Sequence, residues 1–203
     1  MASPQDNISG SYTDQFVTRI WTFDLHALTE QNQAWLSCYQ STRSSSEAGQ
    51  KQSSRNGWSN RGKSLFTDLP ELAPLQRQCM QVFRHVLKAL HSDEFPPLDL
   101  EAWFNVTDPG GANVEHTHPR VLLSGVYYLQ VPDNSGDIIF SDPRPAAVHN
   151  LARYTAKQMT SVYKCTPKAG QLIIFPAWLG HRVEQNNSDL PRVSIAMNAK
   201  LAK

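Results

Sequence analysis

The sequence lacks the features of a membrane protein and of a disulfide-stabilised protein. Its three cysteines, Cys38, Cys79 and Cys165, are far apart and odd in number, which excludes a disulfide framework and a CxxC metal site. No apolar run reaches the length of a membrane span, and the polar start of the chain has no apolar signal core. We therefore expect a cytoplasmic protein with no membrane partner.

The sequence also lacks an excess of charge of either sign. A formal net charge of +1 argues against broad electrostatic binding to nucleic acid. The chain has 203 residues, of which 40% are hydrophobic, enough for one domain with a sizeable core. We expect a single domain over residues 1–203 and leave its oligomeric state open, a homodimer included.

Residues 1–99 are expected to support a core with one strand and two helices. Residues 16–25 predict the strand, because they are apolar and β-branched. Residues 27–43 predict a helix with Thr29 as a candidate N-cap, and residues 71–90 give the strongest helical pattern. The apolar stripes of these helices are Leu28, Trp35, Leu36 and Tyr39 in the first and Leu75, Val82, Phe83, Val86, Leu87 and Leu90 in the second.

A segment rich in Ser, Gly, Asn and charge, residues 44–64, separates the two helices. Such a composition predicts a mobile surface loop. The alternative is a basic lid, with Trp58 folded over a site. Its charged residues are Lys51, Arg55, Arg61 and Lys63 against Glu47.

From about residue 100 the sequence turns into short β-like runs separated by Pro, Gly, Asn and Asp. The expected strands are residues 100–106, 121–131, 136–142, 171–177, 181–185 and 192–200. Helices followed by many short strands predict a mainly β fold with flanking helices. A double-stranded β-helix, the jelly roll that cupins also adopt, would protect the strand edges and place the core at residues 100–203.

Three histidines predict a metal site in this β region. His116 and His118 stand one residue apart in "EHTHPR", and side chains at i and i+2 of a strand share a face. Pro119 favours extended geometry at His118, whereas Glu115 would point the other way and is a poor ligand. His181 follows "GQLIIFPAWLG" at the start of a predicted strand.

The other histidines, His26, His85, His91 and His149, are interpreted as helix, loop or surface residues, of which only His149 could approach the site.

Arg192 is a candidate anion-binding residue. It begins the apolar run "RVSIAMN" and shares a strand face with Ser194. A buried arginine needs an anion, and its planar fork suits a carboxylate. The alternative is an arginine that reaches solvent at a strand edge.

The motifs "HTHP", "LSGVYYL", "DPR", "GQLIIFPAWLGH" and "RVSIAMN", in that order, resemble the non-haem Fe(II), 2-oxoglutarate-dependent oxygenases. More narrowly, they resemble a bacterial and phage group of that class whose substrates are unknown. The resemblance covers about half of the chain, and "NGWSN" near residue 58 is similar to an N-terminal element of the group. It implies a dioxygenase that holds Fe(II) in the mouth of a double-stranded β-helix and uses 2-oxoglutarate to oxidise a substrate.

The resemblance also assigns residues. It implies His116 as the first metal ligand and His181 as the distal one. Arg192 and Ser194 would hold the distal carboxylate of 2-oxoglutarate, with help from Tyr128 and from Asn105 on the preceding strand.

The sequence departs from the common pattern at the middle ligand. That ligand is Asp or Glu in the usual facial triad, but His118 stands there. Asp142 in "SDPR" could replace or join it, or could simply bond backbone in a turn. We prefer His118, because it is close to His116 and on the same face. Three histidines also suit Zn(II).

Two rival interpretations remain at this stage. A cupin-like metal dioxygenase or isomerase would explain Gly110, His116 and His118, but Leu122 and Leu123 stand where its glutamate is expected. A non-catalytic metal-binding jelly-roll protein would need no 2-oxoglutarate. In the oxygenase interpretation the substrate is an unidentified small molecule or side chain, and nucleic acid is not expected as a partner.

Overall fold

The computed structural model describes residues 13–45, 53–62, 65–90, 97–144 and 161–202. The strands are β1 (Trp21–Asp24), β2 (Ser54–Ser59), β3 (Leu98–His116), β4 (Leu123–Gln130), β5 (Ile138–Ser141), β6 (Val162–Cys165), β7 (Gln171–Pro176), β8 (His181–Val183) and β9 (Arg192–Leu201). The helices are η1 (His26–Gln31), α1 (Asn32–Ser44), α2 (Leu65–Asp68), η2 (Pro70–Leu72) and α3 (Ala73–Leu90). None of these helices is long and apolar enough to cross a membrane.

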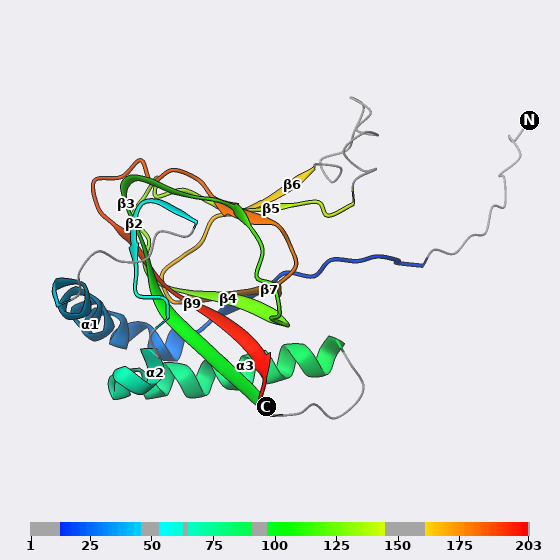
Figure 1. Cartoon of the computed structure of the whole chain (residues 1–203), viewed down its shortest axis with the longest axis horizontal. Helices are drawn as coiled ribbons and strands as arrows, with labels where there is room; N and C mark the ends of the chain where they lie inside the picture. The colour runs from blue at the N-terminus through cyan, green and yellow to red at the C-terminus, as the bar shows by residue number, and fades with distance from the viewer. Residues whose placement is uncertain (1–12, 46–52, 63–64, 91–96, 145–160, 203) are drawn as a thin grey trace, which may run out of the picture.

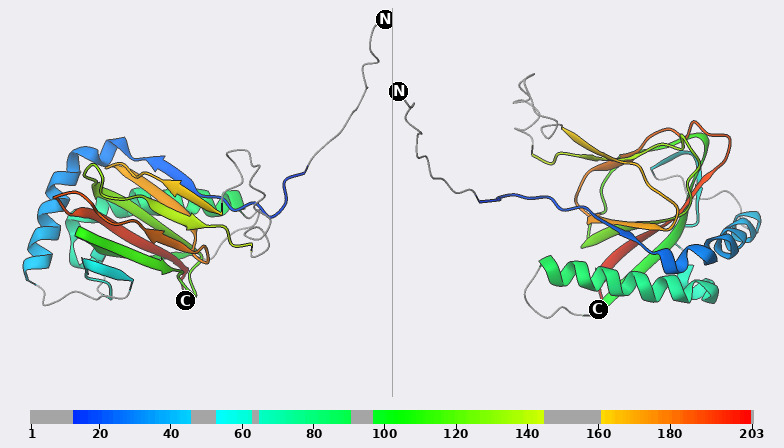
Figure 2. Two further views of the ribbon diagram at one scale, coloured as in Figure 1. Left: turned by 90° about the horizontal axis from the view of Figure 1, so that it is seen from above. Right: turned by 180° about the vertical axis from the view of Figure 1, so that it is seen from behind.

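The strands form one antiparallel sheet that curls around an interior (Figure 1). The strand order is β1-β7-β4-β9-β3-β8-β5-β6, with β2 also paired to β3. The long strand β3 joins the two halves of this order, because its first part pairs with β9 and its last part pairs with β8. Figure 2 shows the strands surrounding the interior in the view from behind. The predicted double-stranded β-helix is confirmed.

The helices cover one outer face of the sheet (Figures 1 and 2). The apolar face of α3 is buried against β3, β4 and β9 in a single large hydrophobic cluster. Gly125 of β4 makes this approach close, since a Cβ there would lie 2.7 Å from the Phe83 ring. Trp35 of α1 packs edge-on against Tyr127 of β4 at 6.1 Å between ring centroids. The predicted helical stripes are confirmed, except that Leu90 is 39% exposed.

The segment between the helices differs from the prediction. Within residues 44–64, which were expected to form a loop, Ser54–Ser59 pair with β3 as strand β2. Trp58 is 5% exposed and packs against Tyr39 at 6.0 Å, so it belongs to the core and does not cover a site. Lys51 and Lys63 lie outside the described residues, and Arg55 is exposed.

Three smaller predictions are also corrected. Thr29 lies inside η1, and neither η1 nor α1 has a side-chain N-cap. The first strand is shorter than residues 16–25 and starts at Trp21. Strand β6 had no predicted counterpart.

Candidate metal centre

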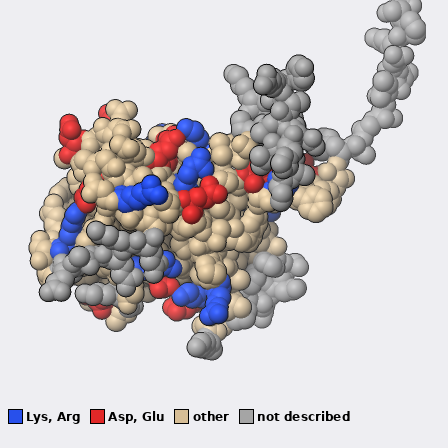
Figure 3. Space-filling view, turned by 45° about the horizontal axis from the view of Figure 1, so that its top comes forward, with Lys and Arg blue, Asp and Glu red and all other residues tan. Residues whose placement is uncertain are grey.

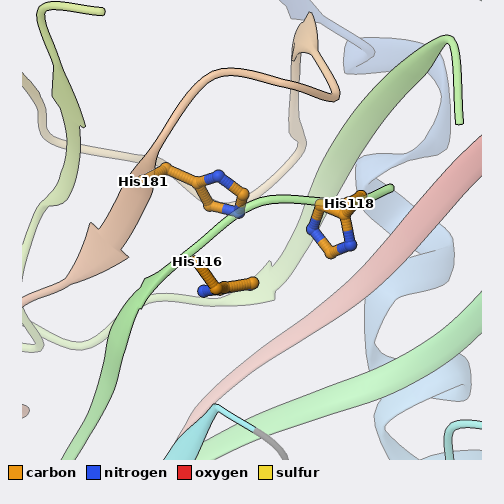
Figure 4. A group of neighbouring side chains, drawn as sticks. All are labelled: His116, His118 and His181. Carbon is orange, nitrogen blue, oxygen red and sulfur yellow. The ribbon is translucent and has the colours of Figure 1, made fainter. Parts of the chain in front are cut away.

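Three histidine side chains converge inside the curled sheet (Figure 4). One ring nitrogen from each of His116, His118 and His181 lies within 4.8 Å of the others. The ring centroids are 4.3 Å apart for His116 and His181, 5.1 Å for His116 and His118, and 5.2 Å for His118 and His181. Among the described residues, this is the group of potential ligands arranged to hold a metal ion.

Strand pairing brings the three histidines together. His116 is the last residue of β3 and stands opposite His181, the first residue of β8. The strand was expected to continue through His118, but it ends at His116. His118 is instead held by a hydrogen bond from its backbone N–H to Ala177 O at 2.8 Å. This hydrogen bond holds His118 beside the segment that leads from Ala177 to His181. The ring of His118 therefore still faces the rings of His116 and His181.

Backbone carbonyls fix the orientation of two of the rings. His116 Nδ1 lies 2.8 Å from Val114 O, and His181 Nδ1 lies 2.9 Å from Leu179 O. A carbonyl oxygen only accepts, so each Nδ1 carries the proton and each Nε2 keeps its lone pair. This arrangement is typical of histidines that bind a metal through Nε2.

The surroundings keep the three imidazoles neutral. Burial, reinforced by the neighbouring histidines and Arg61, lowers the pKa of His118 to about 3. Burial and His116 lower the pKa of His181 to about 4, and burial also lowers the pKa of His116. Because metal binding requires unprotonated imidazole, the donor set fits a divalent ion such as Fe(II) or Zn(II).

The neighbouring carboxylates point elsewhere. Glu115 accepts hydrogen bonds from the Ser141 hydroxyl at 2.8 Å and from Arg182 at 3.0 Å. Asp142 accepts from the Arg144 backbone N–H at 3.0 Å and pairs with its guanidinium at 2.7 Å. Asp142 lines a separate surface hollow beside Tyr163. The structure therefore places Asp142 in the turn that was its alternative interpretation, outside the histidine cluster.

The histidines line a cavity of about 70 Å³. All four residues expected to hold 2-oxoglutarate also line it: Asn105, Tyr128, Arg192 and Ser194. Tyr128 and Ser194 stand opposite each other on β4 and β9, and Asn105 stands opposite Ser194 on β3. Burial raises the pKa of Tyr128 to about 12, so its hydroxyl stays a donor.

Arg192 is buried, with 2% of its surface exposed. Its guanidinium donates to Ser135 O at 3.2 Å, to Gly136 O at 3.0 Å and to Thr107 Oγ1 at 3.0 Å. These three partners are neutral, and Arg192 forms no salt bridge within the described part of the chain. Burial lowers its pKa, yet an arginine remains charged. Within the described residues, two of its five N–H donors have no hydrogen-bond partner.

Other residues at the cavity were not predicted. Arg61 lines it and stacks over Trp103, with 4.7 Å from Cζ to the ring centroid. Asn113 and Ser54 line it as well. The only sequence signal for this wall was "NGWSN", which ends just before Arg61.

The remaining histidines take no part in the described site. His26 is exposed in η1, and His85 is exposed on α3, where its ring contacts Phe23 at 6.5 Å. His91 and His149 lie outside the described residues.

Residues 101–198 match the model of the family described as "Putative 2OG-Fe(II) oxygenase". No curated protein sequence matches the chain significantly. The match covers slightly less than half of the chain, so the β core, residues 101–198, is similar to this family.

Several solved structures share the fold of this chain. A prolyl-4-hydroxylase from Pseudomonas putida is 14% identical with a TM-score of 0.58, covering 92% of this chain and 94% of that one. HygX from Streptomyces hygroscopicus, with nickel and 2-oxoglutarate bound, is 11% identical with a TM-score of 0.60, covering 90% and 83%. A prolyl hydroxylase from Trichoplax adhaerens is 12% identical with a TM-score of 0.63 and the same coverage.

Proposed function

We propose that the protein is an Fe(II)- and 2-oxoglutarate-dependent dioxygenase whose metal ligands are His116, His118 and His181. The observation that carries this proposal is a single cavity lined by three neutral imidazoles and by Arg192 of the neighbouring strand β9. Arg192 is buried, and its hydrogen bonds within the described residues do not use all of its N–H donors. A divalent metal and a dicarboxylate cosubstrate would complete these two halves of the site.

The protein and its cofactors have different tasks. When bound, iron and 2-oxoglutarate would supply the oxidising chemistry. The histidines would bind the metal, and Arg192 would orient the cosubstrate by a charge-assisted hydrogen bond to its distal carboxylate. The Tyr128 hydroxyl would donate a hydrogen bond to the same carboxylate, and Ser194 and Asn105 line the cavity beside it. Apolar walls exclude bulk water from the reacting centre; they include Val126, Ile138 and Phe175.

His118 as the middle ligand gives the centre a distinct charge. A facial triad with one carboxylate neutralises part of the metal charge, whereas three imidazoles leave the full double positive charge. The described residues that line the cavity include no Asp or Glu. In this proposal, 2-oxoglutarate or the substrate would supply the negative charge at the metal.

We expect the substrate to be a small molecule or an amino-acid side chain. On the face shown in Figure 3, Lys and Arg are interspersed with Asp and Glu, and this mixture argues against nucleic acid as a partner. We place the protein in the cytoplasm, where three unbridged cysteines are stable.

The proposed function is tested by 2-oxoglutarate turnover. The purified protein should convert 2-oxoglutarate to succinate slowly without substrate, in a reaction that requires both Fe(II) and oxygen. His181→Ala should abolish this turnover, and Arg55→Ala, an exposed change on β2, should leave it intact. Turnover that survives His181→Ala would reject the assigned centre.

A further inference from the structure

Two buried polar side chains, Ser124 of β4 and Asn198 of β9, form a pair inside the curled sheet. They stand opposite each other in the β4–β9 pairing, and the Ser124 hydroxyl donates to Asn198 Oδ1 at 2.9 Å. Ser124 is 2% exposed and Asn198 is 1% exposed. Ser124 lines the same cavity as the three histidines. Neither metal binding nor the distal carboxylate of 2-oxoglutarate accounts for this pair.

Asn198 lies on the cavity side of β9. Side chains at alternate positions of a strand share a face, and Arg192, Ser194 and Ala196 of β9 all line the cavity. Asn198 continues this series by one more step of two residues. Arg192 and Asn198 therefore stand at opposite ends of the inner face of β9.

The Ser124–Asn198 pair lies at the metal end of this face. Phe175 stands opposite Ser124 on β7, and its ring is 4.6 Å from that of His181. On the other side of β9, Trp103 lies one step of two residues from the pair, and its ring is 6.4 Å from that of His118. One aromatic side chain thus connects the pair to each of two proposed metal ligands.

Backbone hydrogen bonds also tie this part of β9 to His118. Leu122 N–H donates to Ala199 O at 3.0 Å, and Ala177 N–H donates to Leu122 O at 3.2 Å. His118 N–H in turn donates to Ala177 O at 2.8 Å. These three hydrogen bonds join the residue that follows Asn198 to the middle ligand, so the sheet itself sets the position of the Asn198 amide beside the metal centre.

Asn198 has a hydrogen-bond donor without a partner. Its Nδ2 is buried and makes no hydrogen bond within the described part of the chain. Glu101, which stands opposite Asn198 on β3, instead accepts from Lys200 Nζ at 2.6 Å. Buried polar atoms are rarely left unpaired unless a ligand or water satisfies them. The free N–H of Asn198 therefore fits an acceptor atom of a ligand in the cavity.

We propose that Asn198, oriented by Ser124, donates this free N–H to the keto-acid carboxylate of 2-oxoglutarate, the end of the cosubstrate that binds the metal. A dicarboxylate that lies along the inner face of β9 meets Arg192 with its distal carboxylate and Asn198 with the other. This second contact limits the orientations in which the keto acid binds the metal. The inference rests on the proposed function, because it assumes that 2-oxoglutarate binds at the three histidines.

The test is carbon-13 NMR of 2-oxoglutarate bound to the Zn(II)-loaded protein, since Zn(II) suits three histidines and has no redox chemistry. The cosubstrate is labelled either at C1, the keto-acid carboxylate, or at C5, the distal carboxylate. Asn198→Ala removes the donor, and Asn198→Leu removes it while filling the space. At saturation, both variants should move the C1 resonance and leave the C5 resonance in place. Both should also weaken 2-oxoglutarate binding by about tenfold, because a hydrogen bond to a charged group is lost.

Two further variants calibrate the two resonances. Arg192→Lys changes the other end of the same strand face and should move the C5 resonance while C1 stays in place. Arg55→Ala, an exposed change on β2, should move neither. The affinity for Zn(II) without cosubstrate should be the same in both Asn198 variants as in the parent protein.

Three results would overturn this inference. The C1 resonance could stay in place in both Asn198 variants, or C1 and C5 could move together as in a general distortion of the cavity. Loss of Zn(II) binding in both variants would instead make Asn198 part of the frame that holds the metal ligands. The proposed function fails in a different way, since 2-oxoglutarate would then not bind the Zn(II)-loaded parent protein at all.

Discussion

At the scale of single residues, His118 would determine what kind of metal centre the proposed site forms. Its ring faces those of His116 and His181, while Asp142, the alternative candidate ligand, is paired with Arg144. The sequence could predict this preference because His116 and His118 are local neighbours. It could not predict that β3 ends between them, since a hydrogen bond to the distant Ala177 holds His118.

We expect His118→Ala to weaken metal binding far more than Asp142→Ala. Loss of a residue that only supports a ligand typically costs tenfold to a hundredfold in affinity, so loss of a ligand should cost more than about a hundredfold. Asp142→Ala should change the affinity less than about threefold, because its contacts lie in another hollow. Calorimetric titration of both variants with Zn(II) measures the ranking, and the reverse order would identify Asp142 as the ligand.

Arg192→Lys should weaken 2-oxoglutarate binding by about tenfold to a hundredfold, because lysine keeps the charge and loses the two-pronged geometry. Metal affinity in the absence of cosubstrate should barely move, since Arg192 bonds Ser135, Gly136 and Thr107 and no metal ligand. The two titrations are made in sequence on one sample, metal first. An unchanged affinity for 2-oxoglutarate would make Arg192 a structural residue.

At the scale of secondary-structure elements, the strands rich in apolar residues were predictable and the polar ones were not. Their apolar runs identified β4, β7 and β9, whose buried residues fill the core. Strand β2, "SRNGWS", has a loop-like composition and becomes a strand only through its pairing with β3. Strand β6, "VYKC", is short, half-exposed and at the sheet edge. In both β2 and β6, pairing with another strand outweighs the local sequence preference. The sequence analysis therefore did not predict that β2 residues line the cavity.

The packing of α3 on the sheet depends on Gly125 of β4. Gly125→Ala would place a methyl group 2.7 Å from the Phe83 ring and 3.3 Å from Ile173 O. Overpacking of this kind costs about 1–3 kcal/mol in the free energy of unfolding. Gly180→Ala is the control, because its nearest contact would be 3.4 Å from the Glu115 side chain. If Gly125→Ala and the parent protein unfold at the same urea concentration, α3 can shift to accept the methyl group without loss of stability.

At the scale of the whole molecule, the proposed metal centre would join two parts of the sheet. His116 ends β3 and His181 begins β8, so an ion bound between them would stabilise only the folded state. The curled sheet and the helices share one large hydrophobic cluster, so we propose that the chain is one domain and unfolds in a single transition.

Saturating metal should therefore raise the melting temperature. At a free concentration of about 100 times Kd, binding adds about 2.7 kcal/mol, which corresponds to a rise of about 5–10 °C for a chain of this size. Addition of 2-oxoglutarate should raise it further only when metal is present. Calorimetric scans of the parent protein and His181→Ala provide the comparison, and an equal metal-induced rise in both would place the ion outside the three-histidine centre.

The central claim is that one cavity binds Fe(II) through three histidines and 2-oxoglutarate through Arg192. The most direct measurement is an anaerobic titration of the Fe(II)-loaded protein with 2-oxoglutarate, followed by the weak visible charge-transfer absorption of the chelate. We expect the band to saturate at one 2-oxoglutarate per iron and one iron per chain, to be absent in His181→Ala, and to require higher 2-oxoglutarate in Arg192→Lys. A protein that binds iron at His116, His118 and His181 and develops no band with 2-oxoglutarate would contradict the account.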